Sequence, residues 1–308
     1  MLAQPAAAQG AADGYPNQVV RIVVPFSAGS ATDILARTVA ERLQERWGQQ
    51  IIVENRPGAA GTGSVARAMP DGYTLMVTSN GHTVVGLLNK SLPFDPLQDF
   101  SGVTQIASVP LVLIVYPELP AKTLKEFIDL VKAKPGQYNF ASPGLGSTTF
   151  IAGALFKQTA GLDLQHVPYR GAPESVTSVI RGDSHMYFTP ANVGVELIQT
   201  GKARALAVTT PQRLPQLPDT PTFAEAGLPG FSYDSWFGLM APAGVPAAIL
   251  EKVSRDTAQT LAAADLKNRL ASQGITAVSN TPAAFDRIIR DDAARFAELF
   301  KEAGVGAK

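Results

Sequence analysis

The feature that most restricts how this chain can fold is an alternation of short β-branched runs with helical patterns. Val19–Val24 has the apolar character of a buried strand, and Ile34–Trp47 follows with apolar residues at helical spacing. The same order returns in strand Gln50–Val53, helix Ser64–Met69 and strand Tyr73–Thr78. Strands that alternate with helices predict mainly parallel sheets and an α/β fold.

The alternation continues through the middle of the chain. A long apolar run at Val109–Tyr116 predicts a strand, and Thr123 is the candidate N-cap of a helix over Thr123–Lys134. Two long helices are predicted at the end, Ala247–Ala263 and Pro282–Ala303. Between these parts the pattern predicts strands Tyr138–Ala141, His166–Tyr169, His185–Thr189 and Ala203–Thr209, and helices Ala172–Ile180 and Val193–Gln199.

Chain length and two apolar runs predict two domains. At roughly 150 residues per domain, 308 residues suggest about two. The runs Val103–Val115 and Trp236–Met240 lie between the two sets of units, so we expect the chain to cross there. The first domain is then 15–105 plus 235–308, the second is 106–234, and a ligand cleft lies between them. Residues 1–14, rich in Ala and Gln, are expected to be a disordered remnant of an export-signal region, with a plain disordered tail as the alternative.

Composition excludes several classes of function. The 26 basic residues balance 26 acidic ones, so bulk charge attracts neither nucleic acid nor membrane. Without cysteine, the chain has no disulfide and no thiolate ligand or nucleophile. The histidines, His82, His166 and His185, lack metal-ligand spacing, and no G-x-S-x-G, H-E-x-x-H or Walker A pattern occurs. We therefore expect that the protein binds no metal and no cofactor and is not an enzyme.

One glycine motif partly matches a dinucleotide-binding fingerprint. Gly61, Gly63 and Ala66 follow a predicted strand with the required spacing. The fingerprint also needs an acidic residue about 20 positions further on, for the ribose. No Asp or Glu occurs between Tyr73 and Phe94, so the motif is interpreted as the Gly-rich start of a helix.

Two small-residue loops carry the functional prediction. Phe26–Asp33 and Ser142–Phe150 each follow a predicted strand and open a helix. Helix starts present unpaired N–H groups and a positive dipole end, which favour anions. Either loop alone is also explained as a capped turn, with Ser30 or Thr32 as the first cap. One such loop in each predicted lobe suggests an anion held between facing helix starts.

Eight segments together resemble a known receptor family. The chain is similar to the Bug-type (TctC-like) receptors, the periplasmic substrate-binding proteins of tripartite tricarboxylate transporters. The resemblance runs from Tyr15 to the C-terminal helix. It is carried, in order, by YPNQVVRIVVPFSAGSATDILAR, VENRPGAAGT, PDGYTL, LPFDPLQDF, VPYRGAPESV, GKARALAVTT, LPDTPTFAEAGLPGF and WFGLMAPAGVP.

The resemblance implies a two-lobed type II periplasmic-binding (Venus flytrap) fold, with a mixed or parallel sheet flanked by helices in each lobe. It also implies that both loops grip one carboxylate, partly through water. Asp33 is expected to cap its helix or order water, because carboxylates repel each other. The predicted ligand-binding residues are Phe26, Ser27, Ala28, Gly29, Ser30, Ala31, Thr32, Asp33, Ser79, Asn80, His82, Gly144, Gly146, Ser147, Thr148, Thr149, Phe150, Tyr169, Arg170, Thr189, Pro190 and Ala191.

Two departures from the family bear on the ligand. Phe150 stands where these receptors often have His, and Thr189 stands where they often have Asp. An apolar ring and a neutral hydroxyl suit an amino group poorly and an apolar or aromatic body better. We therefore expect a carboxylate other than an amino acid, with aromatic and dicarboxylic acids as the candidates.

The predicted function is that of a monomeric, exported periplasmic receptor. It would capture a small organic carboxylate and deliver it to the membrane permease of a tripartite tricarboxylate transporter, with no nucleic-acid partner. Two alternatives stay open at this point: a ligand-sensing receptor for a signalling partner, and an α/β enzyme that acts on a carboxylate.

Overall fold

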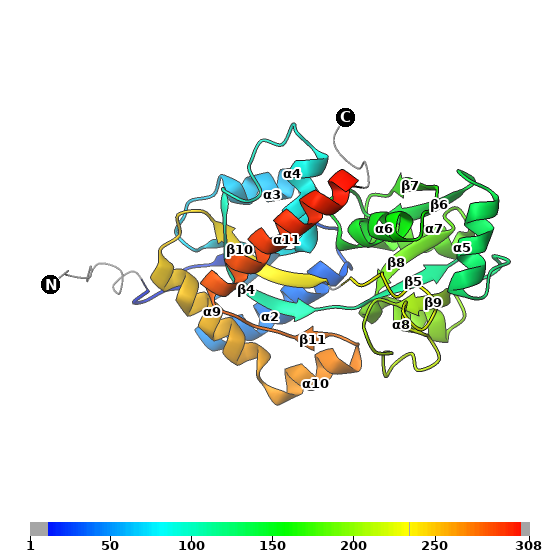
Figure 1. Ribbon diagram of the computed structural model, residues 1–308. Helices are drawn as coiled ribbons and strands as arrows, with labels where there is room; N and C mark the ends of the chain where they lie inside the picture. Colours follow the sequence, from blue (N-terminus) through cyan, green and yellow to red (C-terminus); the bar gives the residue numbers. More distant parts are fainter. Residues whose placement is uncertain (1–11, 234, 303–308) are drawn as a thin grey trace.

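The chain folds into two lobes, each built around one β-sheet with helices on its faces, as the computed structural model shows for residues 12–233 and 235–302 (Figure 1). Lobe 1 contains a six-stranded sheet in the order β11-β4-β10-β3-β1-β2, and lobe 2 a five-stranded sheet in the order β7-β6-β8-β5-β9. The α/β class predicted from the sequence is confirmed. Residues 1–11 of the predicted export-signal remnant lie outside the described residues.

In lobe 1, parallel pairing places the carboxyl ends of β1 and its two neighbours at the same edge of the sheet, which faces the cleft. β1 (Val20–Val24) pairs in parallel with β2 (Ile51–Asn55) and β3 (Thr74–Ser79). β10 (Trp236–Pro242) is antiparallel to β3 and to β4 (Phe100–Ser108). The short β11 (Thr276–Ala277) closes the other edge against β4. The sheet is therefore mixed.

In lobe 2, β6 occupies a place similar to that of β1 in lobe 1. β6 (Tyr138–Ser142) pairs in parallel with β7 (Leu164–Pro168) and β8 (Met186–Pro190). β5 (Leu111–Val115) is antiparallel to β8 and to β9 (Arg204–Val208). Both strand-to-helix loops singled out in the sequence thus leave parallel strands at their carboxyl ends, where α/β proteins bind ligands.

Most of the predicted helices begin and end within a few residues of their expected positions, but the short helices at Asn80–Val84 and Val85–Leu88 were not predicted. The Gly-rich segment before Ser64 is already helical, so α3 begins at Ala59, earlier than the predicted start at Ser64. A separate helix, α10, follows α9 and was not predicted. The helices are α2 (Ala31–Trp47), α3 (Ala59–Ala66), the 3₁₀ helix η1 (Asn80–Val84), α4 (Val85–Leu88), α5 (Leu124–Ala133), α6 (Thr148–Thr159), α7 (Ala172–Arg181), α8 (Ala191–Gln199), α9 (Ala247–Leu261), α10 (Ala264–Ser272) and α11 (Pro282–Glu302).

Two crossovers connecting the lobes lie side by side. The chain leaves lobe 1 after Ser108 and enters lobe 2 at Leu111, so the boundary expected after residue 105 falls within β4. On its return the chain passes Ser235. The Val109 N–H donates to the Ser235 carbonyl at 3.0 Å, and the Ser235 hydroxyl donates to the Val109 carbonyl. These hydrogen bonds hold the two connections together.

The last helix, α11, packs against both lobes. Near its start, Phe285 stacks edge-on against Trp236 of β10 at 5.0 Å between ring centroids. Near its end, Phe296 and Phe300 are buried in the aromatic core of lobe 2, where Phe300 meets Phe150 of α6 at 6.5 Å. Figure 1 shows α11 running from β10 to the neighbourhood of α6. The helix therefore spans the junction between the lobes.

Candidate functional site

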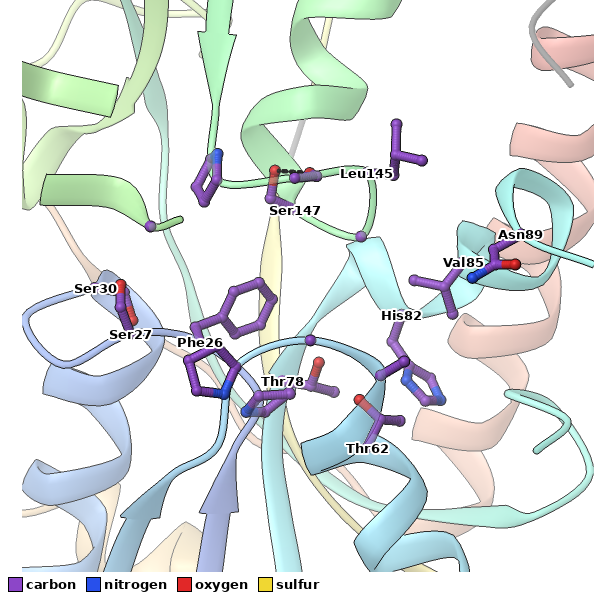
Figure 2. A pocket seen from close by; sticks show the side chains of 18 of the residues that line it. Phe26, Ser27, Ser30, Thr62, Thr78, His82, Val85, Asn89, Leu145 and Ser147 are labelled. Carbon is purple, nitrogen blue, oxygen red and sulfur yellow. Dashed lines mark hydrogen bonds between the residues drawn. The ribbon is translucent and has the colours of Figure 1, made fainter. Parts of the chain in front are cut away.

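A cavity of about 280 Å³ lies between the lobes. Lobe 1 lines it from the loop after β1, the start of α3, β3, η1, α4 and the segment that follows α4, and lobe 2 from the loops after β6 and β7 (Figure 2). The lining residues are Pro25, Phe26, Ser27, Ser30, Pro57, Gly58, Ala59, Thr62, Thr78, His82, Val85, Leu88, Asn89, Leu92, Phe94, Pro143, Gly144, Leu145, Gly146, Ser147, Arg170, Gly171 and Ala172.

The loop after β1 is built as a capped helix start. Ser30 is the N-cap of α2, and its hydroxyl accepts a hydrogen bond from the Asp33 N–H at 3.2 Å. The buried Asp33 carboxylate accepts from the Gly29 N–H at 2.9 Å, from Arg37 Nε at 3.0 Å and from Asn55 Nδ2 at 2.9 Å. Asp33 does not line the cavity, and its carboxylate holds the loop in shape.

The loop after β6 has a matching construction in lobe 2. Ser147 is the N-cap of α6: its hydroxyl accepts from the Phe150 N–H at 3.1 Å and donates to the Gly144 carbonyl at 2.7 Å. The Ser142 hydroxyl accepts from the Gly144 N–H at 3.0 Å and lies 2.7 Å from Nε2 of His166. Gly144 has φ of +121°, which favours glycine. The loop is thus fixed from both of its ends.

Close backbone contacts show that the lobes are closed around the cavity. A Cβ atom on Gly81 of η1 would lie 2.0 Å from the Gly146 carbonyl oxygen, and one on Gly171 would lie 2.2 Å from Oγ of Ser27. Tyr233 adds a polar bridge, because its hydroxyl donates to Oδ1 of Asn80 at 3.2 Å and lies 2.8 Å from Oγ1 of Thr148. Glycine at these positions allows the two lobes to meet.

His82 is a neutral member of the lining. Its Nε2 lies 2.8 Å from the Pro96 carbonyl, and its ring packs edge-on against Phe100 at 4.8 Å. Burial lowers the pKa of His82 to about 4, although the Pro96 carbonyl opposes this shift. Since a carbonyl only accepts, we assign the ring proton to Nε2, which leaves Nδ1 as an acceptor.

The charges around the cavity favour an anion. Among the described residues, Arg170 is the one lining residue with a formal charge at neutral pH, and no Asp, Glu or Lys among them lines the cavity. The Ser27 hydroxyl is buried and has no hydrogen-bond partner among the described residues. A ligand anion would satisfy such a hydroxyl, whereas a ligand ammonium would find no carboxylate in the lining.

The structure brings eight predicted residues to the cavity: Phe26, Ser27, Ser30, His82, Gly144, Gly146, Ser147 and Arg170. Phe150, which was expected to shape the cleft, instead packs between Phe140 and His166, and Thr189 is buried within β8. The predicted residues outside the lining are Ala28, Gly29, Ala31, Thr32, Asp33, Ser79, Asn80, Thr148, Thr149, Phe150, Tyr169, Thr189, Pro190 and Ala191.

The sequence prediction missed one wall of the cavity. This wall comes from the start of α3, from α4 and from the segment 89–94. The segment RPGAAGT directly after β2 was a usable signal, because it leaves a parallel strand at the same sheet edge as the loop after β1. The apolar residues after η1 carry no such signal. The missed side chains include Pro57, Thr62, Thr78, Val85, Leu88, Asn89, Leu92, Phe94 and Leu145.

Comparison with known proteins places the chain in a family. The model of the tripartite tricarboxylate transporter family receptor, TctC, matches residues 35–305. The chain belongs to this receptor family. Protein BugT of Bordetella pertussis is 35% identical to this receptor over 307 residues, which cover 98% of this chain and 94% of BugT. A protein of Pseudomonas sp. strain P51, from the tcbD-tcbE intergenic region, is 34% identical over 94% of this chain and 88% of its own length.

Solved structures of relatives share the fold of this receptor. A protein from R. palustris with adipate has a TM-score of 0.90 and 32% identity, and covers 96% of this chain and 100% of its own. MatC of Rhodopseudomonas palustris, with bound malate, has a TM-score of 0.87 and 30% identity over 92% and 99% of the two chains. The periplasmic binding protein BugD has a TM-score of 0.89 and 30% identity over 96% and 100%. The predicted family and periplasmic-binding fold are therefore confirmed.

Within the described part of this receptor, each helix is too short or too polar to cross a bilayer. The same residues contain no group of three or more His, Asp or Glu side chains placed to hold a metal ion.

Proposed function

We propose that this receptor is a periplasmic solute-binding protein that captures a small organic carboxylate between its lobes and delivers it to the permease of a tripartite tricarboxylate transporter. The observation that carries this proposal is the arrangement of two capped helix starts, at Ser30 and Ser147, on opposite lobes of one cavity. Relatives with structures containing adipate and malate support the carboxylate class. A relative described as a periplasmic binding protein supports the compartment.

The helix starts supply hydrogen-bond donors for an anion. The first N–H groups of a helix have no partner within it, and the caps take one each. At α2, Ser30 bonds the Asp33 N–H, so those of Ala31 and Thr32 remain. At α6, Ser147 bonds the Phe150 N–H, so those of Thr148 and Thr149 remain. With the positive ends of the two helix dipoles, these groups favour a carboxylate.

A ligand that binds to both lobes couples its own binding to closure of the lobes. A ligand that contacts lobe 1 at Ser27 and lobe 2 at Ser147 stabilises the closed arrangement only, because the two groups separate when the lobes open. A permease that recognises the closed form would then distinguish loaded from empty receptor. The same coupling predicts that a bound carboxylate raises the melting temperature.

The double variant Ser147→Ala, Thr148→Ala tests the carboxylate grip. The variant keeps the backbone N–H groups but removes the hydrogen bonds that fix them, from Ser147 to Gly144 and Phe150 and from Thr148 to Tyr233. The expected result is a loss of affinity by about tenfold or more, about 1.4 kcal/mol, for every carboxylate that the wild type binds. A thermal-shift screen of adipate, malate, benzoate and aspartate selects the ligands, and calorimetric titration measures the affinities.

The control for this test is Thr123→Ala. Thr123 caps α5 with its hydroxyl on the Glu126 N–H at 3.2 Å, and it does not line the cavity. Its loss lowers stability by about 1 kcal/mol and leaves carboxylate affinity unchanged. If the double variant keeps the wild-type affinity, or if the control loses as much affinity as the double variant, the α6 start does not bind the carboxylate.

A further inference from the structure

We propose that the ligand of this receptor is a monocarboxylate with an uncharged, apolar body. Its carboxylate lies toward the starts of α2 and α6, and its body lies toward α4 and the segment 89–94. This inference rests on the proposed function and narrows the class of ligand. It follows from the unequal distribution of charge between the two ends of the cavity.

The donor groups gather at one end of the cavity. Ser27 and Ser30 lie at the α2 start, and Figure 2 shows them on the side away from Val85 and Asn89. The backbone of Arg170 adjoins the same end, because the next residue, Gly171, packs directly on Ser27: a Cβ on Gly171 would lie 2.2 Å from Oγ of Ser27. The exposed Arg170, which carries the one formal positive charge of the described lining, is therefore anchored beside the unpartnered Ser27 hydroxyl.

The opposite end of the cavity is apolar. Val85 and Leu88 of α4 line it together with Leu92 and Phe94 of the segment that follows. Lobe 2 closes this end with the loop after β6: a Cβ on Gly146 would lie 2.6 Å from Cγ1 of Val85. These aliphatic and aromatic side chains can bury the surface of an apolar ligand body away from water, which favours its binding.

The polar groups at the apolar end carry no charge. Oδ1 of Asn89 accepts from the Ser91 N–H at 2.9 Å, so Asn89 can offer a ligand only the neutral N–H groups of Nδ2. His82 holds its proton on Nε2 toward the Pro96 carbonyl, so Nδ1 presents a lone pair rather than a donor. A second carboxylate placed here would exchange part of its hydration for contact with neutral side chains and would gain no cation from the described lining, which makes a dicarboxylate the poorer ligand.

Two matched ligand pairs test this inference by calorimetric titration of the whole chain. Hexanoate and adipate share one carbon chain and differ in whether the far end is methyl or carboxylate, and 4-methylbenzoate and terephthalate differ in the same way. We expect each monocarboxylate to bind at least about tenfold more tightly than its dicarboxylate. Equal or tighter binding of adipate and terephthalate overturns the inference and leaves the proposed function intact. Failure of these four acids and of malate to bind overturns both.

A charge placed at the apolar end tests the orientation of the ligand. Leu92→Arg supplies the missing cation, so it should raise the affinity for adipate relative to hexanoate by about tenfold. The control is Leu97→Arg, at a leucine that is 39% exposed and outside the lining, which should leave the ratio unchanged. Asn89→Arg, at an exposed lining position, makes the same test with less risk to folding. An unchanged ratio in folded Leu92→Arg and Asn89→Arg overturns the orientation.

Discussion

At the scale of single residues, His82 links the ligand cavity to the stability of lobe 1. The residue is 3% exposed, and its ring contacts Phe100 and hydrogen-bonds to the Pro96 carbonyl, which fixes the segment after α4 beside η1. The neutral form is the one compatible with this burial, because a charged imidazole would lose its hydration. At mildly acidic pH, His82 is therefore protonated in the unfolded chain and neutral in the folded protein.

The pH dependence of unfolding tests this role. The ordinary pKa of 6.5 falls to about 4 in the folded protein, so between these values the unfolded chain binds a proton that the folded chain does not. The free energy of unfolding should be unaffected by His82 above pH 6.5 and should decrease from pH 6.5 to 4. In His82→Gln, whose amide also reaches a carbonyl, we expect this decrease to be smaller by about 1–3 kcal/mol in urea titrations.

The control is His185→Gln. His185 lies half-buried at the start of β8, and burial lowers its pKa as well. Because water reaches this ring, the change in pH dependence should be smaller than that of His82→Gln. An equal pH dependence of unfolding in His82→Gln and in the wild type would show that His82 does not supply the acid sensitivity.

At the scale of elements, β10 and α11 meet at a glycine. β10 hydrogen-bonds to both β3 and β4, with a register shift beside Gly238. A Cβ on Gly238 would lie 2.1 Å from Cζ of Phe285, so the ring of α11 lies directly on the backbone of the strand. The helix can approach the sheet this closely only because the strand has no side chain there.

Gly238→Ala should therefore destabilise the protein by about 1–3 kcal/mol, the typical cost of overpacking. The measurement is the midpoint of denaturant unfolding followed by circular dichroism. Gly230→Ala is the matched control, because the nearest atom to its added Cβ, Cγ2 of Thr159, is 3.9 Å away. Equal stability of the two variants would mean that the contact between β10 and α11 adapts without strain.

For individual helices and strands, the sequence predicted most elements but not all of their boundaries. β-branched runs predicted the strands, and the Thr123 cap predicted α5, because both signals are local. The start of α3 was predicted too late, because the glycines before Ser64 weaken the helical pattern, yet one of them is required by packing: a Cβ on Gly61 would lie 1.9 Å from the Arg56 carbonyl oxygen. α10 was missed because only Ala262 and Ala263 separate it from α9, without a Gly or Pro to mark the break.

The residues of the candidate site also fall into a set that the sequence predicted and a set that it did not. The α2 and α6 starts were predicted because cap residues after a strand form a short sequence pattern. Val85, Leu92 and Phe94 were not, because they are ordinary apolar residues whose meeting at the cavity depends on how the segment after η1 folds over lobe 1. The ligand-binding role of both sets stays a prediction.

At the scale of the whole molecule, closure depends on a contact between the backbones of the two lobes. Gly81 of η1 faces the Gly146 carbonyl, and the Tyr233 hydroxyl bridges Asn80 and Thr148 beside it. The crossovers at Val109 and Ser235 are hydrogen-bonded to each other, so opening of the lobes separates the first contact while the crossovers stay together.

Gly81→Ala should hold the lobes apart, because its Cβ would lie 2.0 Å from a backbone oxygen of the opposite lobe. We expect about tenfold weaker carboxylate binding and a larger radius of gyration in X-ray scattering at saturating ligand. Gly86→Ala is the control, since its Cβ would meet only Pro96 of the same lobe, at 3.1 Å. Wild-type compaction of ligand-bound Gly81→Ala would contradict this account of closure.

The position of α11 also affects the order in which the molecule can be completed. Lobe 2 begins at β5, near residue 111, but Phe296 and Phe300, which fill its aromatic core, come from the last helix. A chain emerging from a ribosome or a membrane pore exposes β5 to β9 well before these two rings arrive. The aromatic core of lobe 2 therefore stays partly exposed to water until nearly the whole chain has emerged, and lobe 2 can complete its folding only then.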